Sequence, residues 1–159
     1  MPLTQRRLTA ALNAGAIAIG INAAMLALAD TTGLATGHDG LLRLLLGIVG
    51  EEDTTLPPPV VCMAFHGIVG LLMALAYAAL LEPWLPGQPW LRGLVFGIST
   101  YALSVLLVQY ESIASDVAIP VSGVAWFAAA HVTYFVVLGA LFPVFYRRTQ
   151  PCDSEPGWQ

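Results

Sequence analysis

Two histidines, His66 and His131, are the residues of this chain whose type and spacing could support chemistry. Each lies in a long apolar run, and each is followed sixteen residues later by a charged residue, Glu82 or Arg147. Ionisable side chains inside a membrane are costly and usually functional. If both runs are membrane helices, the equal spacing places the two imidazoles at one depth.

A pair of imidazoles on neighbouring membrane helices could hold a b-type haem, since axial histidines are ordinary haem ligands. Cys62 lies one helical turn before His66, so Cys62, His66 and His131 together could bind copper or zinc through thiolate and imidazole ligands. A neutral histidine that hydrogen-bonds a neighbouring helix satisfies the same pattern, and the spans carry no carboxylate to orient a metal ligand. The sequence therefore favours structural histidines without a cofactor, with haem b as the alternative.

Other chemistry finds little support in the sequence. It lacks a serine elbow, an HExxH pattern and a phosphate-binding glycine loop, which carry the common hydrolytic and phosphoryl-transfer reactions. We predict that the chain is not an enzyme and identify no soluble substrate. A small transporter or proton channel is a further alternative, in which the two histidines are the only ionisable groups that lie well inside the spans.

The composition indicates a membrane protein. Of the 159 residues, 57% are hydrophobic and 10% are charged, which is too much apolar surface for one small water-soluble core. The net charge of -4 and the absence of lysine exclude an extended nucleic-acid-binding face. We predict an all-α polytopic protein whose residues 1–148 form a four-helix transmembrane domain. Its helices are expected at about residues 8–29, 60–81, 93–110 and 121–146.

The arginines orient these helices. Five of the six fall on the side that an even number of crossings assigns to both termini, and most acidic residues fall on the other side. Arginine gathers on the cytoplasmic side of membrane proteins. The five are Arg6, Arg7, Arg92, Arg147 and Arg148. We therefore predict a multi-pass protein of the bacterial inner membrane with cytoplasmic N- and C-termini.

The connections differ in kind. The outer loop, residues 30–59, contains an apolar stretch at about residues 40–50 that is too short to span and is predicted to form an amphipathic interfacial helix. Trp84 and Trp90 in the inner loop are predicted interface anchors, because indoles favour the headgroup layer. The polar C-terminal tail, residues 149–159, shows no periodicity.

Small residues four apart predict close helix packing in the spans. Ala14 and Ala18 form such a pair in the first predicted helix, and Gly93 and Gly97 form one in the third. Small side chains allow helix backbones to approach where no hydrophobic force drives association.

The region from Cys62 to Arg148 resembles a family of small uncharacterised four-helix bacterial inner-membrane proteins. In that family a histidine-containing helix ends in a tyrosine and a Pro-Gly turn, an Arg-Gly pair opens the third helix, and a second histidine marks the fourth. The matching positions are His66, Tyr77, Pro86, Gly87, Arg92, Gly93, Phe96, Gly97, His131, Tyr134 and Gly139. The resemblance implies the four-helix fold and its topology, and it implies no activity.

We therefore expect a non-catalytic accessory or assembly subunit of a larger bacterial membrane complex, one of respiratory or photosynthetic energy conversion. Its expected partners are membrane lipids and other integral membrane subunits.

Overall fold

A computed structural model describes residues 4–38, 58–115 and 118–148 of the chain. Its elements are the helices α1 (Gln5–Thr31), α3 (Pro58–Ala76), α4 (Pro89–Ser115) and α5 (Val121–Arg148), and a short π-helix, η2 (Tyr77–Leu81), that continues directly from α3. The described residues contain no strand. The expected helix at residues 40–50 and the tail at residues 149–159 lie outside the described residues.

Within the described residues, three segments are long and apolar enough to cross a membrane. They are Gln5–Thr31, Met63–Leu81 and Val121–Arg148. This finding indicates a helical membrane protein. Helix α4 has 27 residues, which at about 1.5 Å per residue is also a sufficient length, but its crossing remains a prediction from the sequence.

Local sequence signals explain where the helices begin and end. The side chain of Thr4 caps α1 by accepting a hydrogen bond from the backbone of Arg7. Gly33, just beyond the other end of α1, has a φ of 72°, a backbone conformation that favours glycine. Pro89 opens α4, where its missing N–H removes no helical bond. Compared with the sequence prediction, α4 begins four residues earlier and ends five later, so Glu111 lies in this helix rather than in a loop.

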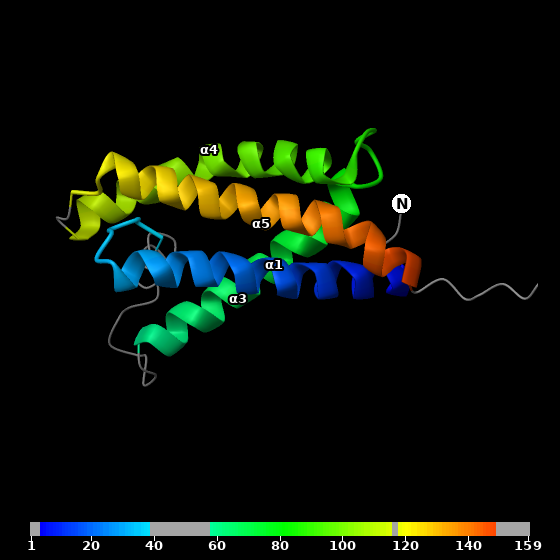
Figure 1. The fold of residues 1–159 in the computed structure, drawn as a ribbon, viewed down its shortest axis with the longest axis horizontal. Helices are drawn as coiled ribbons and strands as arrows, with labels where there is room; N and C mark the ends of the chain where they lie inside the picture. The colour runs from blue at the N-terminus through cyan, green and yellow to red at the C-terminus, as the bar shows by residue number, and fades with distance from the viewer. Residues whose placement is uncertain (1–3, 39–57, 116–117, 149–159) are drawn as a thin grey trace, which may run out of the picture.

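Helix α5 is central to the arrangement. It packs against α1 and α4, while α3 packs against α1 and crosses it obliquely (Figure 1). The segment Met63–Leu81 is accordingly the least enclosed of the three apolar segments. In its most apolar 18 residues 17% are buried, against 39% in α5. The start of α1, the start of α4 and the end of α5 lie at one end of the molecule (Figure 1). We call this the arginine end, defined by Arg6, Arg7, Arg92, Arg147 and Arg148.

Small residues set the spacing of the helices. Ala14 and Ala18 are fully buried on α1. Gly93 and Gly97 of α4 face Phe135 of α5, and a Cβ atom at Gly93 would overlap the backbone carbonyl of Phe135. Both glycines therefore serve the close packing of α4 on α5 within this chain.

Candidate functional site: a histidine cavity between the membrane helices

His66 is hydrogen-bonded across helices. Its Nε2–H on α3 donates to the side-chain oxygen of Asn22 on α1 at 2.7 Å. Asn22 is buried, with 3% of its surface exposed. Helix α3 packs mainly on α1, and this bond joins the two helices and orients the imidazole ring.

His131 on α5 has a different environment. Its ring contacts Phe127 edge to face, with 4.3 Å between the ring centroids. Within the described residues no side chain hydrogen-bonds to it, and its Nδ1 is buried without a hydrogen-bond partner. The Phe127 carbonyl one turn earlier interacts with the ring but does not reach hydrogen-bond geometry with Nδ1. A buried polar group left in this way costs about 1–3 kcal/mol.

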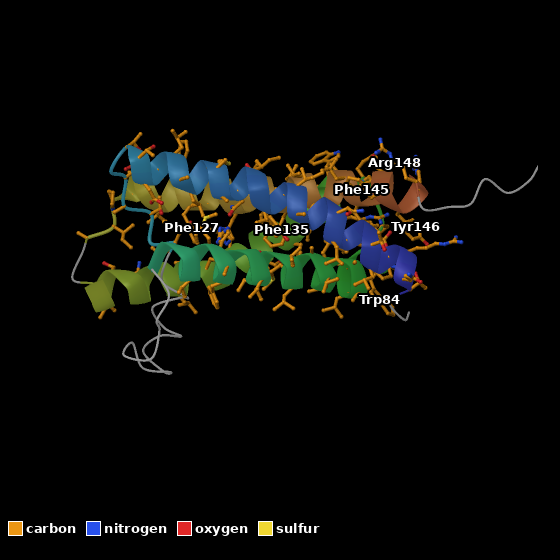
Figure 2. All side chains as sticks on the ribbon, turned by 90° about the horizontal axis from the view of Figure 1, so that it is seen from below. Trp84, Phe127, Phe135, Phe145, Tyr146 and Arg148 are labelled. Carbon is orange, nitrogen blue, oxygen red and sulfur yellow. The ribbon has the colours of Figure 1, made fainter. Side chains whose placement is uncertain are left out.

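Both histidines line one partly open cavity of ≈ 100 Å³, which we call the histidine cavity. Asn22 and Ser104 add polar groups to its wall, and Phe65, Phe127, Phe135 and Met73 add apolar ones. Phe127 and Phe135 lie inside the bundle, whereas Trp84 and Arg148 lie at the arginine end (Figure 2). Two residues that are far apart in the sequence thus share one site.

Two further parts of the chain lie next to the histidine cavity. Gly37 and His38, from the segment after α1, line it on the side away from the arginine end. His38 is held there by Thr36, whose Oγ1 lies 2.8 Å from its Nδ1. Toward the arginine end, the cavity meets a buried apolar cluster that includes Leu138 and Phe142.

The cavity does not match the shape that haem requires. Sites for large ligands have volumes of about 300–1,000 Å³, several times the ≈ 100 Å³ found here. Gly70, one turn from His66, leaves no room for a macrocycle, because the side chain of Ile19 occupies the place of its missing Cβ. Tyr134 further ties α5 to α3 by donating its hydroxyl to the Gly70 carbonyl at 2.5 Å. Haem ligation by His66 and His131 would need α3 to move, and it stays a prediction that a visible absorption spectrum can test.

A metal centre gains no support either. The described residues contain no group of three or more His, Cys, Asp or Glu side chains that could hold a metal ion. The side chain of Cys62, the third ligand expected from the sequence, lies outside what the structure describes.

A second polar site, at the arginine end, was missed by the sequence analysis. Arg7 of α1 forms an ion pair with Glu82, and Arg92 of α4 approaches the same carboxylate at 3.5 Å. Arg7 is buried, with 8% of its surface exposed. We call Arg7, Glu82 and Arg92 the ion cluster. It joins three elements that are separate in the chain.

The π-helix explains why Arg7 binds here. The N–H of Glu82 donates to the carbonyl of Tyr77, five residues back, instead of to that of Ala78. The next residue is Pro83, which has no N–H to offer. The Ala78 carbonyl is therefore left without a helical donor, and the guanidinium of Arg7 donates to it at 2.9 Å. Pro83 next to a charged residue at a helix end was the available signal, but the sequence analysis used Glu82 only as a boundary.

The predicted interface anchors lie near the ion cluster. Trp84 follows η2 and Trp90 lies in the first turn of α4, with 74% and 48% of their surfaces exposed. Both indoles are thus available to a lipid headgroup layer at the arginine end.

Comparisons of the chain with protein-family models, with curated proteins and with solved structures find no match.

Proposed function

We propose that this chain crosses the bacterial inner membrane four times, with both termini in the cytoplasm. The grouping of five arginines at one end of the described bundle supports this topology, because arginine is retained on the cytoplasmic side. The exposed tryptophans at the same end agree with a headgroup layer there. Helix α4 supplies the fourth crossing in this proposal.

We further propose that the chain acts as a non-catalytic accessory subunit of a larger membrane complex, one of energy conversion. The observation that carries this proposal is the use of polar side chains inside the bundle. His66 bonds Asn22, Tyr134 bonds the Gly70 carbonyl, and the indole of Trp126 donates to the Met25 carbonyl at 2.8 Å. These groups hold the chain's own helices together and make a rigid scaffold.

Helix α3 offers the surface for a neighbouring subunit. It packs mainly on α1, and Ile68 and Leu72, which lie one turn apart on one face, are each more than half exposed. In a bilayer such a face contacts either lipid or another helix, and van der Waals packing is the main force between membrane helices. The proposal assigns the partner to this face.

The test is gentle purification of the tagged full chain from native membranes, followed by quantitative mass spectrometry. We expect larger subunits to accompany it in a fixed ratio. Leu72→Trp should reduce that ratio, because a bulky side chain on α3 disturbs the contact. Leu106→Trp, on the exposed face of α4, is the matched control and should leave it unchanged. A chain that runs alone at monomer mass contradicts the accessory function, whereas equal effects of the two variants contradict only the choice of face.

A further inference from the structure

Three arginines at the arginine end are exposed. Arg6 lies in the first turn of α1, and Arg147 and Arg148 lie in the last turn of α5. Within the described part of the chain no carboxylate pairs with them, because the Glu82 carboxylate belongs to the ion cluster. The three guanidinium groups are therefore open to an anionic partner.

The positive charge of this end is local. Helices α1 and α5 pack against each other, and the start of α1 lies beside the end of α5 (Figure 1). Five arginines lie at the arginine end, and they outnumber Glu82 together with the two acidic residues of the tail, Asp153 and Glu155. The whole chain carries a net charge of -4. An anion attracted to this protein is therefore attracted to the arginine end and not to the molecule in general.

The guanidinium group of Arg148 is already positioned by the fold. It lies over the ring of Phe145, with 5.9 Å between its central carbon and the ring centroid. A guanidinium group that packs on an aromatic face keeps its N–H groups in its own plane, where they can bind the oxygens of a phosphate in pairs. The side chain therefore loses little further conformational entropy when it binds an anion.

The surroundings of these arginines indicate an amphiphilic partner. Val144, which is 43% exposed, lies one turn before Arg148 on the same face of α5. The exposed indoles of Trp84 and Trp90 mark a headgroup layer at the same end of the bundle. A partner that fits has an anionic group at the level of the arginines and an apolar chain directly inward from it.

We propose that the exposed arginines of the arginine end bind anionic phospholipids, with the headgroup phosphate at the guanidinium groups and an acyl chain along α5 at Val144. A zwitterionic phospholipid carries the same phosphate together with its own cation, so the protein selects the lipid by net charge. The proposal rests on the proposed membrane topology, which puts the arginine end at a headgroup layer. It requires no partner subunit.

The full chain reconstituted in bilayers of equal amounts of dioleoyl phosphatidylglycerol and dioleoyl phosphatidylcholine provides the test. After extraction in mild detergent, native mass spectrometry counts the retained lipids. We expect phosphatidylglycerol to exceed phosphatidylcholine about fivefold, which corresponds to about 1 kcal/mol for one arginine at a membrane surface. Replacing Arg6, Arg147 and Arg148 together by glutamine should bring the ratio to about one. The same three positions changed to lysine keep the charge, and that matched control should stay within about twofold of the unaltered chain.

Two further measurements identify the source of the phosphate and the role of charge. Soluble glycerol phosphate should not displace the retained lipid, because it has no acyl chain to contact Val144. Equilibration of the unaltered chain in about 1 M salt should abolish the preference, since exposed charges are then screened within about 3 Å. The salt measurement decides the question even if the glutamine variant does not fold.

Four outcomes overturn the proposal. They are equal retention of the two lipids, an unchanged preference in the glutamine variant, a preference that survives high salt, and displacement by glycerol phosphate, which would assign the arginines to a soluble anion. Membrane topology and the partner ratio are measured without reference to lipid type. Equal retention would therefore reject the lipid proposal and leave the proposed function standing.

Discussion

The ion cluster and the histidine cavity use polar side chains in opposite ways. In the ion cluster, Glu82 lies between two arginines, and the Ala78 carbonyl that the π-helix frees is occupied by Arg7. The wall of the histidine cavity contains no Asp, Glu, Lys or Arg, and His131 lacks a side-chain hydrogen-bond partner among the described residues. Each site holds one buried nitrogen without a hydrogen-bond partner, Nε of Arg92 and Nδ1 of His131, but only the ion cluster joins its helices through opposite charges.

The helix packing differs in the same direction. At the arginine end, glycines bring the backbones of α4 and α5 into contact, and the place of a Cβ at Gly139 is filled by the Pro89 carbonyl. Around His66 and His131 the helices leave a cavity. The arginine end therefore holds the bundle together, whereas the helices around the histidine cavity leave unfilled space between them. Substitutions at the two sites should therefore differ in size and in sign.

The largest effect is expected from Glu82→Ala. It leaves Arg7 buried without its counter-charge, and breaking a buried pair costs about 3–5 kcal/mol. Since the Glu82 side chain is 27% exposed, we expect the lower value, about 3 kcal/mol of unfolding free energy. Unfolding by SDS titration in mixed micelles measures it. Arg6→Ala, which removes an exposed arginine next to Arg7, should cost less than about 0.5 kcal/mol; similar losses for both would show that the ion cluster is not special.

Gly93→Ala should follow, with a loss of about 2 kcal/mol. The added methyl group overlaps the backbone of Phe135, so α4 and α5 must separate, and overpacking costs about 1–3 kcal/mol. Thermal unfolding in detergent is the measurement. Gly20→Ala is the control, because no atom lies within 4 Å of a Cβ at that position. A Gly93→Ala variant as stable as Gly20→Ala would contradict the close approach of the two helices.

Asn22→Leu should cost about 1 kcal/mol. It removes the acceptor of the His66 hydrogen bond, and bonds between membrane helices contribute about 0.6–2 kcal/mol. Asn13→Leu alters an exposed asparagine on the same helix and should be neutral or slightly stabilising. The difference between the two unfolding free energies isolates the bond, and no difference would mean that His66 does not hold α3 to α1.

The smallest effect, with the opposite sign, is expected from His131→Leu. It replaces a half-buried imidazole, whose Nδ1 is buried without a hydrogen-bond partner, by an apolar side chain of similar size, which removes a desolvation cost. We expect no loss of unfolding free energy and a gain of up to about 1 kcal/mol. A loss as large as that of Asn22→Leu would show that His131 has a structural partner, and the contrast between the two sites would then fail.

The sequence predicted the all-helical fold, because four long apolar runs allow few other structures in lipid. It did not predict the helix ends. Helix α4 extends beyond the predicted span, residues 93–110, at both ends. The prediction used the stretch without charged residues, and that stretch does not show how far the helix continues outside it. Three membrane-length apolar helices among the described residues support the membrane assignment, and the fourth crossing and the orientation remain predictions.

The candidate site was predictable only in part. Equal spacing indicated that His66 and His131 belong together, and both line one cavity. Their different partners were not predictable, because Asn22 meets His66 through the packing of α1 on α3, which no local pattern encodes. The third histidine, His38, lies outside the apolar runs and received no role, yet it lines the cavity. The ion cluster likewise depends on contacts between elements 75 residues apart.

The π-helix also sets the rotational phase between the two sites. In a regular α-helix, the sixteen residues from His66 to Glu82 would turn the side-chain direction through about 160° beyond whole turns. The two residues would then face nearly opposite sides, and α1 could bind only one of them. A π-turn takes up about one residue, or about 100°, and leaves them about 60° apart. Helix α1 therefore binds His66 through Asn22 and Glu82 through Arg7 along a single face. Deletion of one residue from Tyr77–Leu81 would rotate Glu82 by about 100° relative to His66, so that α1 could no longer make both contacts.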